Sequence, residues 1–558
     1  MSGELLGIAT SGLMAFQRSL TTTSHNIVNV DTEGYSRQRA DLAAQDANFI
    51  GQSGYIGSGV NVASVQRSYD VFLTNQVRTS TSAHSELDAY YQLATQVDNM
   101  IADQDSSLSP AMQSFFDAVH GVVNEPTSVP VRRVMLTAAQ TMVNRFNVLN
   151  ENFDNLRDQA YQSMESNINQ LNAQASNLAE LNKKIVAATG KANGNPPNDL
   201  LDQRDQLLVD MAKHLDVRVI PESNGAVNVF VGSGQALVMG TQAASLRVQD
   251  SMYGDTQKDI ALVANGSSNS TIVTNLLTGG DIGGMMNFQK DFLDPAQNDL
   301  GRIAAAFADQ FNTQHRAGFD LNGVAGVDFF FEPSPTVANN KLNTVGSSLT
   351  VAYNDFQQMS GADYKVDVTA TGVNITNLRT SSIQALAVAI PPGTFNLDGL
   401  DFTLSGVNAG DSFIVSPTRA AAGSLSIAAG MNDPALIAAA ATGSATPATA
   451  KVGDNTNALA LTRLQAAKNL LNGRATYQDA FNEIVGTVGN LTKAAEINSS
   501  AQKSLLDQAT QQRDSVAGVN LDEEAANLIK FQQAYQAAAQ TISAAQSTFD
   551  ALIGAVRR

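Results

Sequence analysis

Histidine side chains are the groups in this chain best suited to bind a metal ion or to transfer a proton near neutral pH. The 558 residues contain five of them, at His25, His84, His120, His214 and His315. They are scattered without paired ligand spacing, and the H-E-x-x-H motif is absent. There is also no cysteine, which excludes disulfides, thiolate metal sites and a cysteine nucleophile. We therefore interpret each histidine as a surface or packed side chain and predict no metal site.

Other motifs of enzymes and cofactor-binding proteins are missing as well. No G-x-S-x-G nucleophile elbow, P-loop or dinucleotide-binding glycine pattern occurs, and the G-S-G tripeptides at 57–59 and 232–234 indicate turns. The DLNG tetrapeptide at 320–323 is similar to part of a calcium loop, but its glycine comes too early and the closing glutamate is missing. We predict a turn there, no catalytic residues, and a protein that is not an enzyme and holds no cofactor.

Charge and hydropathy argue against two classes of partner. Lys and Arg number 34 against 52 Asp and Glu, and the net charge of -18 disfavours binding to a nucleic-acid backbone. No run approaches ~18 apolar residues, so no membrane insertion is predicted. The first ten residues, MSGELLGIAT, lack the basic and apolar regions of a cleavable signal peptide. Because a chain without cysteine suits passage between redox compartments, any export is expected to follow a route without such a signal.

The two ends of the chain carry the clearest helical periodicity. Apolar residues recur there at alternating steps of three and four, which keeps one seam facing a partner helix. Near the start the seam contains Leu6, Ala9, Leu13, Phe16, Leu20, Thr23 and Ile27. Near the end it contains Leu528, Phe531, Tyr535, Ala538, Ile542, Ala545, Phe549, Leu552 and Val556. Asn520 can cap this second helix. Each seam needs a partner, and the opposite terminus is the nearest candidate.

Between the ends, long helical patterns alternate with stretches of period two. Helices are predicted over 72–104, 130–189, 284–316 and 456–515. A hairpin is predicted within 216–240, around the Asn224-Gly225 turn signal. The segment 319–450 is rich in Gly, Thr, Asn, Val and Pro, and its strand candidates are SLTVAY, YKVDVTA and DSFIVSP.

This order of elements predicts an α+β multidomain protein. Residues 1–70 and 517–558 are assigned to a terminal helical assembly domain with an extended segment, its helices paired like a coiled coil. Residues 71–318 and 451–516 are assigned to a long-helix bundle domain with a β-hairpin element near 216–275, and 319–450 to an inserted all-β domain. Because several seam positions are Ala or Thr, which bury little surface, we expect the terminal helices to be mobile in the monomer and to order on assembly.

Both terminal segments resemble one family of proteins. Residues 1–38, which end in NIVNVDTEGYSRQ, resemble the N-terminal segment shared by flagellar rod, hook and hook-associated proteins, where a helix runs into N-x-x-N-x-x-T-x-G-Y. The positions of that motif are filled by Asn26, Asn29, Thr32, Gly34 and Tyr35. The continuation SRQ, the tail SVAGVNLDEEAANLIKFQQAYQ, and the internal pieces NDLLDQRDQLL and GFDLNG are similar to the hook-associated protein 1 family. The sequence departs from the usual motif at Asp31 and Glu33, where Asn and Pro are common.

The resemblance implies a secreted structural protein of the bacterial flagellum, the first junction protein between hook and filament. Its implied partners are the flagellar hook protein, hook-associated protein 3, other copies of itself in a ring-like homo-oligomer, and a cytoplasmic export chaperone. The expected assembly interface comprises Leu6, Leu13, Phe16, Leu20, Ile27, Asn29, Gly34, Tyr35, Arg37, Leu528, Phe531, Tyr535, Ile542, Phe549 and Leu552. The chaperone is expected to bind Leu528, Phe531, Tyr535 and Ile542 before export.

Two other functions are open at this point. A hook or distal-rod protein of the same axial family would share the N-terminal motif, although the long helices at 130–190 and 474–515 argue against it. A secreted adhesin or hydrolase could use the β segment to bind sugars, but the chain has no Trp to stack on them.

Overall fold

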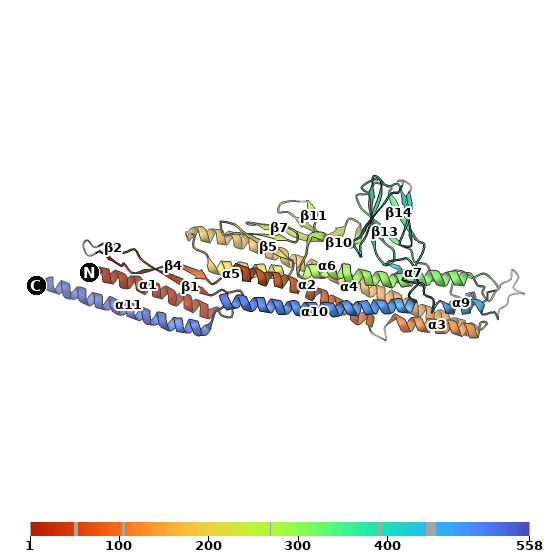
Figure 1. Ribbon diagram of the computed structural model, residues 1–558, viewed down its shortest axis with the longest axis horizontal. Coiled ribbons are helices and arrows are strands. Elements are labelled where there is room, and N and C mark those ends of the chain that lie inside the picture. Colours follow the sequence, from red (N-terminus) through yellow and green to blue (C-terminus); the bar gives the residue numbers. More distant parts are fainter. Residues whose placement is uncertain are drawn as a thin grey trace.

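Long antiparallel helices give the molecule an elongated shape, with both ends of the chain at one extremity (Figure 1). The computed structural model describes residues 2–49, 54–102, 107–192, 194–267, 269–388, 393–441 and 453–556. It contains helices and several small sheets in more than one domain, as the sequence predicts at that level. No helix among these described residues is long and apolar enough to cross a membrane.

The helical elements begin and end where caps and turn residues allow. They are α1 (Ser2–Val28), α2 (Val71–Ala102), α3 (Leu108–Asn124), α4 (Val129–Lys191), α5 (Asn198–Ala212), η2 (Thr274–Leu276), α6 (Gly280–Phe288), η3 (Gln289–Leu293), α7 (Asp294–Arg316), α8 (Ala421–Ser424), η4 (Pro434–Leu436), α9 (Thr456–Arg463), α10 (Tyr477–Ala517) and α11 (Leu521–Val556). The helix predicted over 72–104 is confirmed as α2 up to Ala102, and its last two predicted residues lie outside the described residues. The helix predicted over 130–189 is confirmed to within two residues as α4.

The helical stretch predicted over 456–515 is interrupted, although its long part at 474–515 is confirmed as α10 (Tyr477–Ala517). The chain leaves the helical conformation after α9, and three successive residues, Leu471, Asn472 and Gly473, take positive φ. A capping box then restarts the helix, since the Thr476 side chain accepts from the Asp479 N–H and the Asp479 carboxylate accepts from the Thr476 N–H. The Asn-Gly pair in the sequence was the available signal for this break.

All sheets are small and their paired strands antiparallel. The strands are β1 (Gln38–Ala44), β2 (Asn48–Phe49), β3 (Tyr55–Ile56), β4 (Val60–Arg67), β5 (Val217–Pro221), β6 (Val227–Val231), β7 (Gln235–Met239), β8 (Gln242–Ala243), β9 (Ser245–Ser251), β10 (Gly254–Val263), β11 (Ser270–Ile272), β12 (Phe330–Phe331), β13 (Thr336–Asn339), β14 (Ser348–Tyr353), β15 (Tyr364–Thr369), β16 (Gly372–Asn377), β17 (Ile383–Leu386), β18 (Gly393–Leu397), β19 (Leu400–Ser405), β20 (Ser412–Ser416) and β21 (Ser426–Ile427).

The predicted hairpin is present and is part of a larger sheet. The hairpin predicted around Asn224-Gly225 is confirmed as β5 and β6, with Gly225 at φ +92°. It belongs to a four-stranded sheet, β5-β6-β7-β8, which is followed by a three-stranded sheet, β11-β10-β9. Further along, β13-β20-β15-β16-β17 and β14-β19-β18 form the two larger sheets of the segment that projects from the helices (Figure 1).

Two antiparallel helix pairs follow one another along the long axis. The terminal pair, α1 and α11, packs together at one extremity, and α2 packs along α10 in the middle of the molecule (Figure 1). The β1–β4 ribbon runs beside α1, and α10 passes into α11 through Gly518, Val519 and Asn520. The Asn520 side chain accepts from the Asp522 and Glu523 N–H groups, which confirms the predicted cap.

The helical body has an aromatic core that the terminal pair lacks. The ring centroids of Phe115 and Phe307 lie 5.7 Å apart, those of Phe311 and Phe330 5.3 Å apart, and Tyr477 stands edge-on to Phe307 at 5.4 Å. All of these side chains are fully buried. In α11, by contrast, the described residues that are buried are Glu524 and Ala545 alone.

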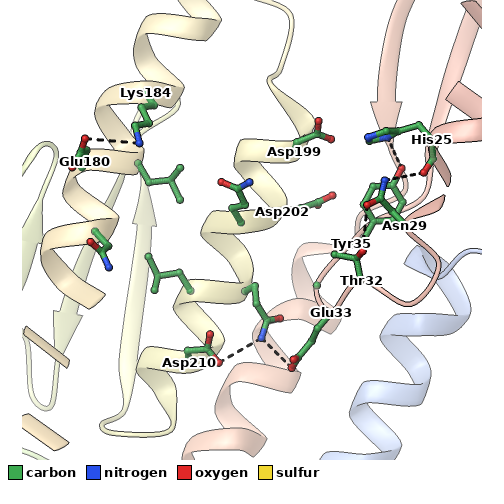
Figure 2. Close-up of a pocket in the computed structure, with 16 residues that line it drawn as sticks. His25, Asn29, Thr32, Glu33, Tyr35, Glu180, Lys184, Asp199, Asp202 and Asp210 are labelled. Carbon is green, nitrogen blue, oxygen red and sulfur yellow. Dashed lines mark hydrogen bonds and ion pairs between the residues drawn. The ribbon is translucent and has the colours of Figure 1, made fainter. Parts of the chain in front are cut away.

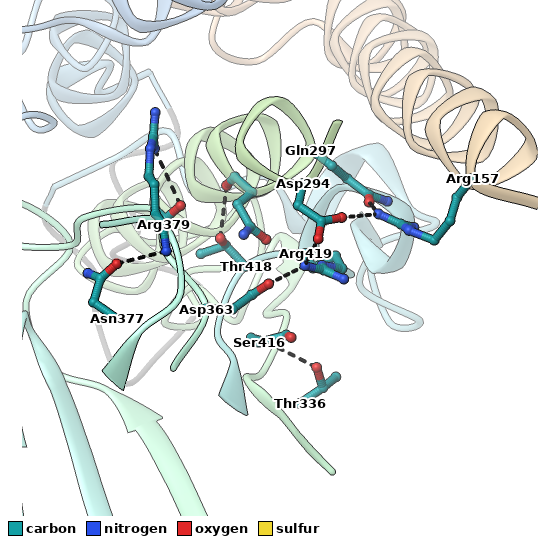
Figure 3. A network of polar contacts seen from close by, with 12 residues as sticks. Arg157, Asp294, Gln297, Thr336, Asp363, Asn377, Arg379, Ser416, Thr418 and Arg419 are labelled. Atoms are coloured by element: carbon teal, nitrogen blue, oxygen red, sulfur yellow. Dashed lines mark hydrogen bonds and ion pairs between the residues drawn. The ribbon is translucent and has the colours of Figure 1, made fainter. Parts of the chain in front are cut away.

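An ion cluster joins the projecting β segment to the helices (Figure 3). Arg419, which follows β20, contacts Asp363 just before β15 and donates to Asp294 at the start of α7, 2.8 Å away. Arg157 of α4 donates to the same Asp294 at 2.8 Å and to Gln297 at 2.6 Å. The cluster therefore joins α4 and α7 to the start of β15 and the end of β20 at the base of the β segment.

Candidate assembly interface

The turn after α1 is held by contacts among its own side chains. The Asn29 amide donates to the His25 carbonyl at 2.9 Å, and the Thr32 hydroxyl donates to the Asn29 side-chain oxygen at 3.2 Å. Gly34 then takes φ +77°, and a Cβ at that position would lie 2.8 Å from the Cβ of Gln206 in α5. Only glycine fits this close left-handed approach without displacing a neighbour.

Asn26 pairs with the chain that returns after the turn. Its side-chain oxygen accepts from the Tyr35 hydroxyl at 2.8 Å and from the Gln38 N–H at 2.9 Å, while its amide donates to the Gln38 carbonyl at 2.9 Å. The Tyr35 oxygen also lies 3.0 Å from His25 Nδ1. Since the phenol proton goes to Asn26, Nδ1 carries the hydrogen in this contact. Burial, and then the nearby Asp199, raise the pKa of Tyr35, so the phenol stays neutral.

Carboxylates of helix α5 bind this returning segment (Figure 2). The Ser36 N–H donates to Asp202 at 3.0 Å, and Arg67 of β4 donates to the other Asp202 oxygen at 2.8 Å. Arg67 also forms an ion pair with Asp205 at 2.7 Å. Burial raises the pKa of Asp202, and the Ser36 N–H and Arg67 partly offset that rise. The NDLLDQRDQLL motif thus supports the N-terminal motif directly.

Arg37 connects the same segment to the C-terminal helices. Its backbone N–H donates to the carbonyl of Ala517, the last residue of α10, at 2.8 Å. Its guanidinium donates to Glu524 at 2.7 Å and to Glu523 at 2.6 Å, both in the first turn of α11. Burial works against the Arg37 cation, but the hydrogen bonds to the two glutamates raise its pKa. The second oxygen of Glu524 accepts from Asn26 at 3.1 Å.

We call this set of polar contacts the terminal junction. It consists of Asn26, Tyr35, Arg37, Gln38, Asp202 and Glu524, from α1, the returning segment, α5 and α11. A cavity of about 630 Å³ lies beside it, between the turn and helices α4 and α5 (Figure 2). Within the described parts of the chain, no group of three or more His, Asp or Glu side chains could hold a metal ion. The contacts of the terminal junction fix the positions of α1, α5 and α11 relative to one another.

The predicted interface residues fall into several groups. Asn29, Gly34, Tyr35 and Arg37 make the contacts within one chain described above. Leu6 and Phe549 are exposed, at 39% and 51%. The side chain of Leu552 lies outside the described residues. The others are half-buried beside the helix contact, namely Leu13, Phe16, Leu20, Ile27, Leu528, Phe531, Tyr535 and Ile542.

Small residues occupy the buried positions of α1, and only Ala9 and Thr23 among them belong to the predicted seam. The buried positions of α1 are Ala9, Gly12, Ala15, Ser19, Thr22, Thr23 and Asn26. Small side chains let two backbones approach closely, so the larger apolar residues are displaced to the flanks. As a result Ile529 is 55% exposed and Met14 is 64% exposed. A groove of about 930 Å³ lies between α1 and β4 and is lined partly by Leu6 and Met14.

Sequence reasoning missed the partners that come from distant parts of the chain. Arg67, Asn198 and Asp202 were not singled out, although NDLLDQRDQLL was noted for its resemblance. Asn198 donates to the Val65 carbonyl at 2.8 Å and so holds the β ribbon to α5. Glu524 lies within the quoted tail SVAGVNLDEEAANLIKFQQAYQ, but it was not singled out as a buried residue. An acidic residue in the first turn of a helix carries little signal of burial, yet Glu524 is only 2% exposed.

Comparison with known proteins assigns the chain to a family. Four family models match: "Flagella basal body rod protein" at 6–35, "Flagellar hook-associated protein FlgK helical domain" at 94–330, "Flagellar hook-associated protein 1, D2-like domain" at 337–417, and "Flagellar basal body rod FlgEFG protein C-terminal" at 510–555. The terminal models cover both sides of the terminal junction.

Relatives match over their full length. Flagellar hook-associated protein 1 of Salmonella typhimurium is 36% identical, that of Escherichia coli 35% and that of Bacillus subtilis 24%, each over 99% of this chain and at least 98% of the relative. The solved structure of the flagellar hook junction protein FlgK from Burkholderia pseudomallei matches with a TM-score of 0.73 and 26% identity, over 79% of this chain and all of that one. This chain therefore belongs to the flagellar hook-associated protein 1 family.

Proposed function

We propose that the protein assembles by packing its terminal pair, α1 and α11, against the terminal pairs of other copies. Membership of the family makes it a structural component of the hook–filament junction in the extracellular flagellum. The observation that carries the proposed mechanism is the exposure of large apolar side chains along both helices, among them Met14, Ile529 and Phe549. Apolar surface of this extent on paired helices is typical of an interaction site.

The energetics of an isolated pair support this mechanism. Fixing the backbone of one residue costs roughly 1–2 kcal/mol, while burying a small side chain such as Ala recovers little. The terminal pair buries mainly small residues, so it gains less than the aromatic core of the body. We expect weak amide protection over 2–28 and 525–556 in the dilute monomer and strong protection after assembly. Protection in the monomer equal to that of α4 would contradict this expectation.

The proposed division into domains follows the same logic. The terminal pair forms a coiled-coil-like assembly domain, the long helices form a bundle domain, and the segment containing β13–β20 forms an inserted all-β domain. The family model at 337–417 covers most of that segment and supports treating it as a unit. The terminal junction is then the connection between the assembly domain and the bundle.

The proposed partners are the hook protein on one side, hook-associated protein 3 on the other, and a cytoplasmic chaperone before export. The half-buried Leu528, Phe531, Tyr535 and Ile542 leave part of their surface accessible on α11, as a chaperone site there requires. Chaperone binding to the full-length chain should weaken in a Phe531→Asp variant. Equal binding by that variant and the natural chain would place the chaperone elsewhere.

Point substitutions on exposed positions of α11 test the assembly mechanism without removing the helix. Ile529→Glu and Phe549→Glu put a charge on side chains that are more than half exposed in the monomer, so the fold should persist. Gln533→Glu and Gln546→Glu add the same charge at exposed polar positions of the same helix and serve as controls. We expect the first two variants to fold but to fail to hold a filament at the hook tip in electron micrographs. Normal filaments with both variants would refute the mechanism.

A further inference from the structure

The contact between α1 and α11 specifies its axial register weakly through apolar packing. The fully buried positions are small residues such as Ala9, Gly12 and Ala15 in α1 and Ala545 in α11, while larger apolar residues such as Leu20 and Phe531 are only half-buried. Small side chains interdigitate shallowly, so a shift of α11 by about one helical turn, 5.4 Å, would bring similar residues into similar places. Some other contact must select one register.

Glu524 is the one buried charged side chain of α11 among its described residues. Its two oxygens contact different elements: one accepts from Arg37 Nε at 2.7 Å and the other from the Asn26 amide at 3.1 Å. Both donors are themselves held in place. Asn26 is paired on both sides with the Gln38 backbone, and the Arg37 N–H is bound to the end of α10. The carboxylate therefore meets its donors at one axial position only.

We propose that Glu524 is the positioning residue that sets the register of α11 against α1. A displacement by one turn would take the carboxylate away from both donors and leave it buried without a partner, which is strongly unfavourable. Single buried polar residues select register in other paired helices in the same way. The non-helical residues between α10 and α11 can absorb such a displacement, so the covalent connection alone does not prevent it.

The consequence for assembly rests on the proposed function. The register decides which apolar side chains of α1 and α11 come side by side on the outer surface of the terminal pair. Subunits in different registers would present different surfaces and would not pack into one regular joint. The register itself, however, is a property of the single chain and can be measured without assembly.

Engineered cysteines can report the register because the natural chain has none. Ala9 and Ile542 lie about equally far along their helices from the Asn26–Glu524 contact, so they lie at about the same height in the antiparallel pair. An Ala9→Cys, Ile542→Cys chain reports the native register. Chains that combine Ala9→Cys with Ala538→Cys or with Ala545→Cys report displacement by about one turn in either direction. Disulfide formation would be timed in dilute monomer and followed by gel mobility.

The test compares Glu524→Leu with Glu523→Leu in each of the three cysteine backgrounds. Leucine at 524 replaces the ion pair with apolar packing, so the helices should still pair but in several registers. Glu523 contacts the same Arg37, but its side chain is 55% exposed, and its replacement should leave the register unchanged. Without either substitution, and with Glu523→Leu, we expect the native pair to form roughly a hundredfold faster than the displaced pairs. With Glu524→Leu the three rates should converge.

Two outcomes would overturn the proposal. If Glu524→Leu slows all three disulfides alike, Glu524 holds the helices together but does not select their register. If Glu524→Leu leaves the native pair as dominant as before, the register is set elsewhere. Neither outcome affects the assembly mechanism, which the Ile529 and Phe549 variants test separately, and circular dichroism of each variant would show that the helices are retained.

Discussion

Replacing Gly34 with alanine should open the turn that rests on α5. Gly34 has φ +77°, and an added Cβ would lie 2.8 Å from both the Cβ and the Oε1 of Gln206. The Cβ of a helical residue is fixed by the backbone of α5, so Gln206 cannot move aside by changing its rotamer alone. The turn must shift away from α5 instead, and the Ser36 N–H is drawn off the Asp202 carboxylate.

The expected cost has two parts. A left-handed conformation costs a residue with a Cβ roughly 1–2 kcal/mol. Weakening the hydrogen bond to the buried Asp202 adds roughly 1–3 kcal/mol. A total of about 2–5 kcal/mol should speed amide exchange at Ser36 and Gln38 by at least about 30-fold, because each 1.4 kcal/mol is about a factor of ten. Hydrogen exchange read by mass spectrometry on peptides covering 30–40 would measure it.

Gly346→Ala is the matched control, since Gly346 has φ +88° and nothing within 4 Å of an added Cβ. It carries the conformational cost without the contact, so exchange at Ser347 should rise only about tenfold. If both variants accelerate exchange in their own turns equally, α5 does not restrain the Gly34 turn. Unchanged exchange at Ser36 in Gly34→Ala would refute the reasoning outright.

Two further predictions concern the body of the molecule. Burial lowers the pKa of His315 to about 4, and neutral His315 accepts from the Ala438 N–H at Nε2. His315 of the unfolded chain takes up a proton below about pH 6.5, whereas His315 of the folded chain does not, so the free energy of unfolding should fall by about 3 kcal/mol between pH 6.5 and 4. Urea unfolding of a His315→Gln variant should lack this pH-dependent loss of stability. An NMR titration that gives His315 of the folded chain a pKa near 6.5 would contradict the prediction. Arg419→Met leaves Asp363 and Asp294 without their shared cation, so the attachment of the β segment to the helices should weaken by about 3–5 kcal/mol. Proteolysis within 337–417 should then be faster in this variant than in the control variant Lys341→Met. Equal proteolysis of the two variants would show that the ion cluster does not hold the segment.

Long periodic helices and short alternating strands could be predicted because their signals are local. The pattern over 130–189 spans many turns, so α4 was located nearly to the residue, and SLTVAY is β14 at 348–353. The break between α9 and α10 was missed because apolar residues continue at helical spacing through it. There the Asn472-Gly473 turn and the Thr476 capping box override periodicity.

The terminal junction could be predicted only in part, because its contacts join residues far apart in the sequence. Asn29 and Gly34 are residue types that favour turns, and both lie in the turn after α1. That Ser36 binds Asp202, and Arg37 binds Glu524, depends on how α5 and α11 are placed by the rest of the fold. A polar side chain in a sequence shows what it can bind but not which partner the fold brings to it.

The apolar seams of the two ends predicted the buried face only in part. The seam near the start includes the buried Ala9, but it misses Gly12 and Ala15, because residues this small carry little periodic apolar signal. Had Phe16 or Phe531 filled the contact, the pair would have been more stable alone and would have had little apolar surface left to offer. With small residues inside and large ones on the flanks, each chain retains on its surface the side chains that other copies can bury. The buried Glu524 then supplies the specificity that small residues cannot.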